Sequence, residues 1–422
     1  MSGILQFVQD ILSQPAILVG IAALVGLVAL RKPINEVLVG TFKSIIGFLI
    51  LGGGANIVVG ALNNLGPMLE TGFGIQGVVP TNEAIVALAQ QTLGQETALI
   101  MIFGFVANII FARFTPLKYV WLTGHHTFYM AAMLAATLGT AGLSGVVLII
   151  VGAILLGLMS VLMPAWAQPT MRKITGGDEI ALGHFGTLGY VTSAFVGRLI
   201  GNPEDSMEDI ELPKQLGFFR DALVSTGLVM IIIFVVATVA AGPGYVQSEL
   251  SGGQNSIVFG IMQGLTFAAG VAVILAGVRM ILGEIVPAFQ GIAERVVPDA
   301  KPALDCPVTF TYAPTAVLVG FLSSFVAGLV GMGILSLTNL AVIVPGLVPH
   351  FFVGGTAGVF GNARGGKIGT IAGAFVNGLI ITFGAALLLP VMGDLGFANT
   401  TFGDADFQWL GILIGLVARL FQ

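Results

Sequence analysis

The sequence predicts an all-α polytopic membrane protein, and its composition supports this fold class in two ways. Of the 422 residues, 56% are hydrophobic and only 9% are charged, and the mean hydropathy is +1.00. A soluble domain carries roughly 25% charged residues, because its surface faces water. The 60 glycines are typical of membrane helices, which approach one another through small residues and break where they line a cavity. A soluble protein with one oversized core is disfavoured, since single cores stop growing at around 250–300 residues.

Apolar stretches of roughly 20 residues predict the membrane-spanning helices. Eight stretches are long and continuous: Ala16–Leu30, Ile45–Leu62, Thr97–Phe111, Leu143–Met163, Ala222–Ala241, Ile257–Leu282, Val317–Leu335 and Ile368–Val391. Three more are short or interrupted by glycine and proline: Phe128–Leu138, Leu337–Phe352 and Trp409–Phe421. We therefore expect about eleven spans, in a single transmembrane domain over residues 1–422 with no soluble domain. Residues 1–15 are expected to be an interfacial lead-in that stays on the mature protein.

Basic residues predict how the chain crosses the membrane. Arg31 and Lys32 follow the first span directly, so the positive-inside rule places the N-terminus outside. The longest polar segment, about residues 168–220, contains Arg172 and Lys173 and is expected to be cytoplasmic. Arg419 favours a cytoplasmic C-terminus, which agrees with an odd number of spans.

The polar segment also contains a short acidic run. Five of the eleven residues from Pro203 to Pro213 are acidic. This run is either a solvated loop or a docking surface for a cytosolic partner.

An internal repeat is suggested by two similar segments. When Gly60 is aligned with Gly283, Asn82 meets Asp305, each 22 residues past its glycine. Both polar residues lie near a proline that interrupts an apolar helix and frees backbone groups to face a solute. Repeats with broken helices of this kind are common in membrane carriers.

Histidine and acidic residues at membrane depth are the candidate site residues, because burying them in lipid is costly. His125 and His126 are adjacent between two apolar stretches, which favours a solute site over two buried core histidines. Asp305 offers a carboxylate that accepts hydrogen bonds from two neighbouring hydroxyls, as a polyol would present them. Its alternative roles are a helix cap or an ion pair with Lys301.

Two further groups of residues are candidates for the same site. Thr81, Asn82 and Glu83 form the polar tip of the first repeat. His184 lies in a Gly-His element at the edge of the polar segment, where it either lines a solute path or caps a re-entrant turn.

Several classes of chemistry find no support in the sequence. There is no basic tract that would indicate nucleic acid. The single cysteine, Cys306, excludes a disulfide framework and a cysteine-rich metal site. Nucleotide-binding loops, nucleophile elbows and zinc-protease motifs are missing. We expect no catalytic residue, metal or cofactor on this chain.

Short segments spread over nearly the whole chain carry a resemblance to a known family. They are Leu30–Lys32, Lys43–Phe48, Leu122–His125, Gly183–His184, Glu208–Pro213, Gly277–Met280, Asp305–Cys306, Tyr312–Pro314 and Ile343–Gly346. Together they resemble the membrane-spanning IIC subunit of the ascorbate-type branch of the bacterial phosphoenolpyruvate-dependent phosphotransferase system.

This resemblance implies a particular transport mechanism. The family members are homodimers in the bacterial cytoplasmic membrane, with a scaffold part and a mobile core part that carries solute by an elevator-like movement. A cytosolic IIB subunit with a phosphocysteine, itself charged by IIA, phosphorylates the solute as it emerges. His125 and Asp305 match family positions that contact the solute, and the phosphoryl-carrying residues belong to the partner chains.

Other positions depart from the family pattern. Ascorbate members carry Asp-Thr-Tyr where this chain has Thr81-Asn82-Glu83. Glutamines are replaced by Tyr129 near the first histidine pair and by Phe185 after His184. The loss of several hydrogen-bonding partners, together with the added aromatic face, should change the preferred solute. L-ascorbate is the first expectation, and another sugar acid, a pentitol or a hexitol is the alternative.

Two other functions remain open at this point. In an ion- or proton-coupled secondary transporter, Glu83, Asp305 and His125 would relay or coordinate the coupling ion. In a structural or sensory membrane protein, the same residues would bind a solute without moving it.

Overall fold

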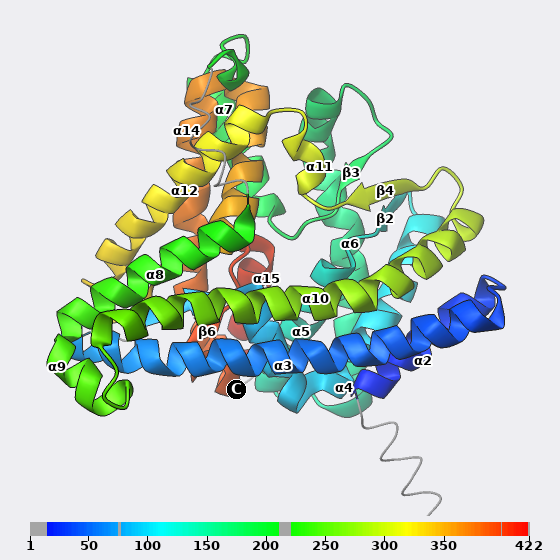
Figure 1. Ribbon diagram of the computed structural model, residues 1–422. Helices are drawn as coiled ribbons and strands as arrows, with labels where there is room; N and C mark the ends of the chain where they lie inside the picture. Colours follow the sequence, from blue (N-terminus) through cyan, green and yellow to red (C-terminus); the bar gives the residue numbers. More distant parts are fainter. Residues whose placement is uncertain (1–14, 75–76, 211–220, 398, 421–422) are drawn as a thin grey trace, which may run out of the picture.

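A computed structural model of the chain describes residues 15–74, 77–210, 221–397 and 399–420 (Figure 1). Eleven helices in this part of the chain are longer than ten residues: α2 (Pro15–Ala29), α3 (Ile34–Phe73), α4 (Asn82–Phe114), α5 (Gly124–Thr140), α6 (Gly145–Thr175), α7 (Thr187–Ile200), α8 (Ala222–Ala241), α10 (Ser256–Val296), α12 (Pro314–Leu335), α14 (Gly355–Leu388) and α15 (Ala405–Ala418). Three short helices connect them: α9 (Pro243–Tyr245), α11 (Pro307–Phe310) and α13 (Leu347–Pro349). The expected lead-in lies almost wholly outside the described residues.

The long apolar helices confirm an all-α membrane protein that crosses the bilayer several times. Among the described residues, six helices are long and apolar enough to span a membrane. A seventh is added if Thr226–Ala241 and Pro243–Leu250, bent by 103°, form one span. The expected count of eleven is not confirmed by these helices.

Two of the weaker expected spans differ from simple membrane helices. Residues 337–352 form a turn, a two-residue strand, α13 and part of a π-helical turn instead of one helix. Pro345 and Pro349 explain the break, because proline has no amide hydrogen to donate in a helix. Residues 128–138 do lie in α5, but they are buried against other protein segments along their whole length.

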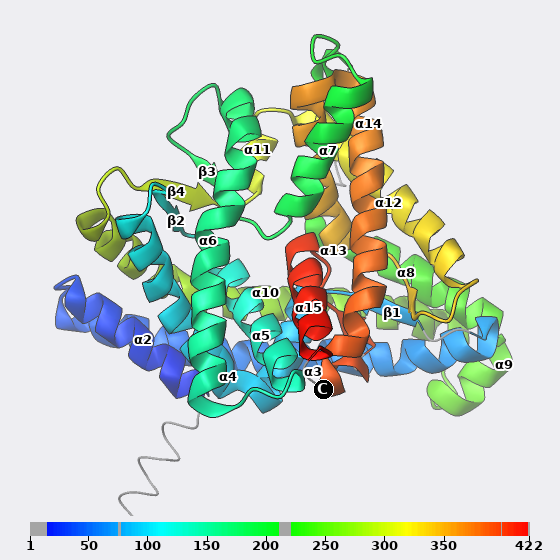
Figure 2. The ribbon, with the colours of Figure 1, turned by 180° about the vertical axis from the view of Figure 1, so that it is seen from behind.

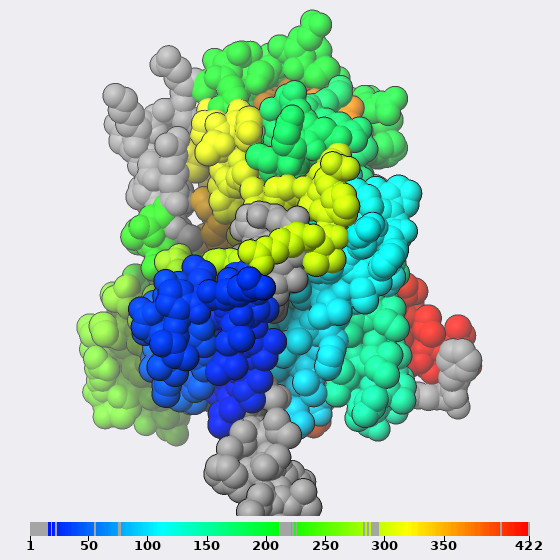
Figure 3. Space-filling view, turned by 90° about the vertical axis from the view of Figure 1, so that its right-hand side faces the viewer, coloured from blue at the N-terminus to red at the C-terminus, as the bar shows by residue number. Residues whose placement is uncertain are grey.

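The helices form two groups that run in different directions. α2, α3, α8 and α10 lie side by side in one layer, and α3 packs along α10 for much of its length (Figure 1). α6, α7 and α14 cross this direction steeply, as the view from behind shows (Figure 2). The two groups are joined by α4, which packs on α6 and also beside α2. The blue and cyan segments therefore lie together in Figure 3.

In the described part of the chain, six short strands form two small sheets between the helices. β1 (Gly77–Pro80) lies between β5 (Val342–Ile343) and β6 (Thr400–Thr401). β4 (Lys301–Leu304) lies between β2 (Tyr119–Trp121) and β3 (Ala181–Leu182). All pairings are parallel, so the carboxyl ends of the three strands in each sheet meet at one edge.

The two sheets share their order and register. In each, a four-residue strand is central, and its last two residues pair with a neighbour: Val79 and Pro80 with β6, and Ala303 and Leu304 with β3. This is the arrangement that an internal repeat would produce. The strands match Gly77 with Lys301, which shifts the sequence alignment by one residue and sets Thr81, not Asn82, against Asp305.

The start of β4 is held by an ion-pair network. The Asp178 carboxylate accepts hydrogen bonds from Arg172 at the end of α6 (2.7 and 3.0 Å) and from Lys301 Nζ (2.5 Å). The guanidinium of Arg172 and the ammonium of Lys301 hold the pKa of Asp178 well below its ordinary value. The network therefore fixes β4 four residues before Asp305.

Two acids of the acidic run make structural contacts. Glu208 accepts hydrogen bonds from the amides of Thr315 (3.1 Å) and Ala316 (2.8 Å), which caps the N-terminus of α12. Asp205 pairs with Lys367 at 2.6 Å, beside a break in α14 at Gly366, whose φ of 57° suits glycine. Glu204 is exposed, and residues 211–220 of the expected cytoplasmic segment lie outside the described residues.

Candidate solute-binding site

The carboxyl ends of the two sheets face one cavity of about 780 Å³. Most polar lining residues follow a strand: Asn82 and Glu83 follow β1, His125 and His126 follow β2, His184 follows β3, Asp305 follows β4 and Asp404 follows β6. The ends of parallel strands carry unpaired backbone groups, and short strands there aim the next side chains in one direction. The fold thus collects residues from five distant parts of the chain.

The opposite wall of the cavity is mostly apolar. α8 contributes Leu223 and Thr226, and α10 contributes Val271, Leu275 and Val278. Arg279, also on α10, is the one cationic side chain other than histidine in the lining that the structure describes. The residues that follow the strands therefore form a polar half of the cavity, and α8 and α10 form a mostly apolar half opposite it.

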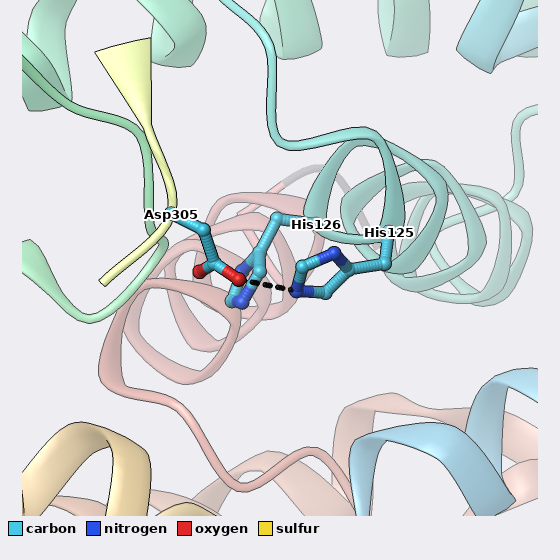
Figure 4. A group of neighbouring side chains, drawn as sticks. All are labelled: His125, His126 and Asp305. Atoms are coloured by element: carbon cyan, nitrogen blue, oxygen red, sulfur yellow. Dashed lines mark ion pairs between the residues drawn. The ribbon is translucent and has the colours of Figure 1, made fainter. Parts of the chain in front are cut away.

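Three histidines and two aspartates form the polar half. His125 Nε2 lies 3.4 Å from Asp305 Oδ2, the contact marked in Figure 4. His184 Nε2 lies 4.0 Å from Asp305 Oδ1 and 3.9 Å from Asp404 Oδ2. His126 and His184 are 2–3% exposed, whereas the side chains of His125 and Asp305 are about one third exposed. His125 and Asp305 therefore lie at the accessible edge of the site, and His126 and His184 lie at its buried end.

The ring of His126 is oriented by a backbone amide. The Phe185 amide donates a hydrogen bond to His126 Nδ1 at 3.3 Å. In the neutral ring the proton is then on Nε2, which lies 3.8 Å from Asp404 Oδ2. A histidine that binds a metal usually donates through its other nitrogen instead. His126 is therefore set up as a hydrogen-bond donor to the cavity and is poorly suited as a metal ligand, although His126, His184 and Asp404 cluster closely.

Asp404 and His184 are also fixed from behind. Asn82 donates from Nδ2 to Asp404 Oδ1 at 2.8 Å, and the Gly403 amide donates to Asn82 Oδ1 at 2.7 Å. The hydroxyl of Tyr190 lies 2.6 Å from His184 Nδ1. These contacts leave Asp404 Oδ2 and His184 Nε2 directed at the cavity. Preorganised groups of this kind bind a solute with little loss of side-chain freedom.

A further buried aspartate joins the two halves of the chain. Asp406 accepts hydrogen bonds from the amides of Thr187 (2.8 Å) and Leu188 (3.0 Å) at the N-terminus of α7. It also accepts one from Trp409 Nε1 at 3.0 Å. Asp406 therefore caps the helix that begins three residues after His184 and holds it against the segment that carries Asp404.

Two polar atoms in the cavity wall have no hydrogen-bond partner among the described residues. One is Glu83 Oε2, and the other is the hydroxyl of Tyr129. The two side chains are 7% and 2% exposed. Buried polar atoms are nearly always paired, so these two are exceptions within the cavity wall.

Of the residues expected from the sequence, seven line this cavity: Asn82, Glu83, His125, His126, Tyr129, His184 and Asp305. Thr81 and Phe185 do not. Thr81 is buried and its amide donates to the Thr401 carbonyl, which continues the pairing of β1 with β6. The ring of Phe185 stacks on Trp121 with ring centroids 4.1 Å apart, and it is the backbone amide of Phe185 that contacts His126.

The alternatives for Asp305 and His184 can now be judged. Lys301 pairs with Asp178, so it is not the partner of Asp305. Asp305 Oδ1 does accept a hydrogen bond from the Cys306 amide at 2.7 Å, and its other oxygen remains with His125. His184 lines the cavity, as a solute path requires.

Asp404 was not expected from the sequence. It lies in Gly403-Asp404-Ala405-Asp406, directly before the last apolar helix, and acids at that depth were the available signal. The two-residue strand β6, which brings Asp404 beside Asn82, is too short to leave a pattern in the sequence.

The chain is thus a membrane protein with a polar cavity that is walled on one side by apolar helices. The chain belongs to the family of sugar-specific permease components of the phosphotransferase system (EIIC-GAT), whose sequence profile matches residues 10–406. It is also similar to the ascorbate-specific phosphotransferase EIIC component of Mycoplasma pneumoniae, with 27% identity over 446 aligned positions. The alignment covers 93% of this chain and 64% of that protein, so the chain spans a little under two thirds of the relative's length.

Proposed function

We propose that this chain is the membrane permease subunit that binds a sugar or sugar acid in the 780 Å³ cavity and moves it into the cytoplasm, coupled to phosphorylation by a partner IIB subunit. The observation that carries this proposal is the convergence of histidines, carboxylates and an amide on one cavity in a chain of this permease family. L-ascorbate is the first solute to test, because the Mycoplasma relative is named for it.

The chemistry of the cavity suits binding without reaction. Carboxylates such as Asp305 and Asp404 accept hydrogen bonds from hydroxyls, and His126 donates one. Cys306 is fully buried, which disfavours it as a nucleophile. The phosphoryl-carrying residues are proposed to lie on the partner IIB and IIA chains. We assign no catalytic residue, metal or cofactor to this chain.

We further propose that the chain works as a homodimer with an elevator-like movement. The apolar wall of α8 and α10 is the kind of surface along which a polar site can slide, because it offers few hydrogen bonds to break. On this view the layer with α3 and α10 belongs to the scaffold, and the two sheets with their strand-end residues belong to the mobile core.

The proposed topology keeps the orientation expected from the basic residues. The N-terminus lies outside and the C-terminus and the segment of about residues 168–220 lie in the cytoplasm. We keep the expectation of about eleven spans, an odd number, which agrees with termini on opposite sides of the membrane. The whole chain then forms one transmembrane domain with an internal repeat.

The test is uptake of labelled ascorbate by vesicles that contain the purified chain, with and without cognate IIA and IIB proteins and phosphoenolpyruvate. The proposal expects a phosphorylated product that appears only when both partners are present. Omitting IIB alone is the matched control. Free solute that accumulates without the partners, and disappears when an uncoupler is added, would instead establish an ion-coupled carrier.

A further inference from the structure

An arginine lies at membrane depth on the apolar wall of the cavity. Arg279 belongs to Ser256–Ile281, the part of α10 that is long and apolar enough to span a membrane. Its side chain is exposed and lines the cavity. A guanidinium at that depth is costly, so it is either paired within the protein or serves a solute.

The acids close to Arg279 in the fold have other partners. Glu284 is five residues further along α10, which is not the same face of a helix, and it pairs with Lys43 of α3 at 3.1 Å. Asp221, which also lines the cavity, accepts hydrogen bonds from the first amides of α8 at 3.0 and 3.1 Å. Among the described residues, Arg279 has no ion pair with either acid. Its charge is therefore available to a ligand in the cavity.

The packing of α10 on α3 indicates on which side of the membrane Arg279 lies. Gly47 packs against Met280, and Gly54, two turns further along α3, packs against Ile274. The two helices are therefore antiparallel, and Arg279 lies nearer to the start of α3 than to its end. The proposed topology places the start of α3 in the cytoplasm, so Arg279 lies in the cytoplasmic half of the cavity wall.

The two walls of the cavity act on an anion in opposite directions. The strand-end half holds the carboxyl groups of Glu83, Asp305 and Asp404, whereas Arg279 is on the α10 half. A phosphate monoester carries about −1.5 to −2 charges at neutral pH. Carboxylates repel this charge, and a guanidinium can bind it through two parallel hydrogen bonds. Phosphorylation therefore turns a solute that fits the strand ends into one that the opposite wall attracts.

We propose that Arg279 forms a phosphoryl subsite, which binds the phosphate monoester of the transported solute on the α10 wall and draws it from the strand-end carboxylates toward the cytoplasm. The cavity has room for both positions, since about 780 Å³ is a volume typical of sites for drug-sized ligands, which are larger than a six-carbon solute. This assignment rests on the proposed permease function. It concerns binding of the product and adds no catalytic residue to the chain.

The test is equilibrium binding to the detergent-purified full chain, without IIA or IIB, measured by calorimetry at pH 7.5. The probes are L-ascorbate, xylitol and galactitol, the phosphate monoester of each on a primary hydroxyl, and inorganic phosphate. At least one monoester is expected to bind, and inorganic phosphate should compete with it but bind more weakly, because it lacks the carbon chain and its hydroxyls. Inorganic phosphate that binds as tightly as every monoester would indicate a general anion site and would overturn the proposal.

Variants at Arg279 test the subsite itself. Arg279→Gln is expected to weaken monoester binding about tenfold or more and to leave binding of the unphosphorylated solute unchanged, since only the monoester meets the guanidinium. Arg279→Lys keeps the charge but loses the paired donors, so its effect should be smaller. Arg113→Gln makes the same change at an exposed arginine outside the lining and should leave both affinities unchanged. Size-exclusion profiles and thermal unfolding establish that each variant is folded.

Three further results would overturn the subsite. These are binding of none of the monoesters, parental monoester affinity in the folded Arg279→Gln variant, or an equal loss for the solute and its monoester, which a merely structural role would produce. Failure of the permease proposal looks different: the monoester binds and its affinity depends on Arg279, but no solute is phosphorylated when IIA, IIB and phosphoenolpyruvate are supplied.

Discussion

The two small sheets have the same backbone design but place different chemistry at the cavity. Each has a four-residue central strand with parallel neighbours in the same register. The sheet around β4 is followed by three histidines and Asp305, and the sheet around β1 is followed by Asn82, Glu83 and Asp404. One side thus supplies the three imidazoles of the described lining, and the other supplies two carboxyl groups, of which Asp404 accepts a hydrogen bond from the Asn82 amide. Two sheets with the same backbone arrangement but different polar side chains can surround a solute whose two ends differ.

The two sheets are also stabilised differently. The sheet around β4 is tied at its outer end by the partly exposed ion pair of Lys301 with Asp178. The sheet around β1 is tied by buried neutral hydrogen bonds, such as that from Thr400 Oγ1 to the Val79 carbonyl at 2.8 Å. Buried bonds contribute more than exposed ion pairs, which solvent screens. The comparison therefore predicts that loss of a buried hydrogen bond in the sheet around β1 lowers stability more than loss of the ion pair in the sheet around β4.

The largest effect is expected for the carboxylates at the strand ends. Asp305→Asn on one side and Asp404→Asn on the other should each reduce solute uptake by about 100-fold, because each replaces a carboxyl oxygen that accepts from solute hydroxyls by an amide nitrogen, which donates. His125→Ala should act like Asp305→Asn, since the two side chains are in contact. Uptake by reconstituted vesicles measures this, with dimer content and insertion as controls. A variant with near-normal uptake would remove its residue from the site.

The next largest effect is expected for Asp406, which joins the start of α7 to the segment that carries Asp404. Asp406→Ala should lower the free energy of unfolding by about 2–4 kcal/mol, because it leaves two amides at the start of α7 and Trp409 without a buried acceptor. Asp406→Asn retains acceptor capacity and should cost less. Thermal or denaturant unfolding in detergent measures both. Equal stability of the alanine variant and the parent would show that the cap is not structural.

A smaller effect is expected within the sheet around β1. Thr400→Val removes one buried hydrogen bond, keeps the side-chain shape and should destabilise the protein by about 1 kcal/mol. The exposed Thr311 provides a control with the same change. Solute affinity should stay at the parental value, because Thr400 is not in the cavity lining. A large loss of affinity with unchanged stability would contradict this separation.

The smallest effect is expected at the outer end of β4. The lowered pKa of Asp178 means that its contribution to stability is present above the ordinary aspartate value of 3.8 and is lost as the pH falls below it. Asp178→Asn should therefore lower the melting temperature slightly at neutral pH and reduce the further loss on acidification. Melting curves of both proteins from pH 7 to pH 3 measure the difference. Two curves that fall in parallel would show that Asp178 contributes nothing through its charge.

The sequence predicted the fold class well and the chain path less well. Low charge and long apolar stretches depend only on the solvent around the protein, so they predicted the helices α3, α6 and α12. They could not predict that residues 337–352 form strand β5 and a broken helix, or that α5 is surrounded by protein. Those outcomes depend on contacts between distant segments.

The candidate site also has features that depend on the solvent alone and features that depend on contacts between distant segments. His125 and Asp305 could be predicted because a polar residue at membrane depth is costly wherever it lies. The contact of the Phe185 amide with His126, and the partnership of Asn82 with Asp404, required the strands to be assembled.

The most direct test of the account is a structure of the full chain with its solute bound, determined by cryo-electron microscopy in lipid nanodiscs. The account predicts one solute in contact with both sheets at once, within hydrogen-bond distance of His126 and Asp305 on one side and of Asp404 on the other. A solute that contacts only one sheet, or that lies outside the cavity between the strand ends and α10, would contradict it.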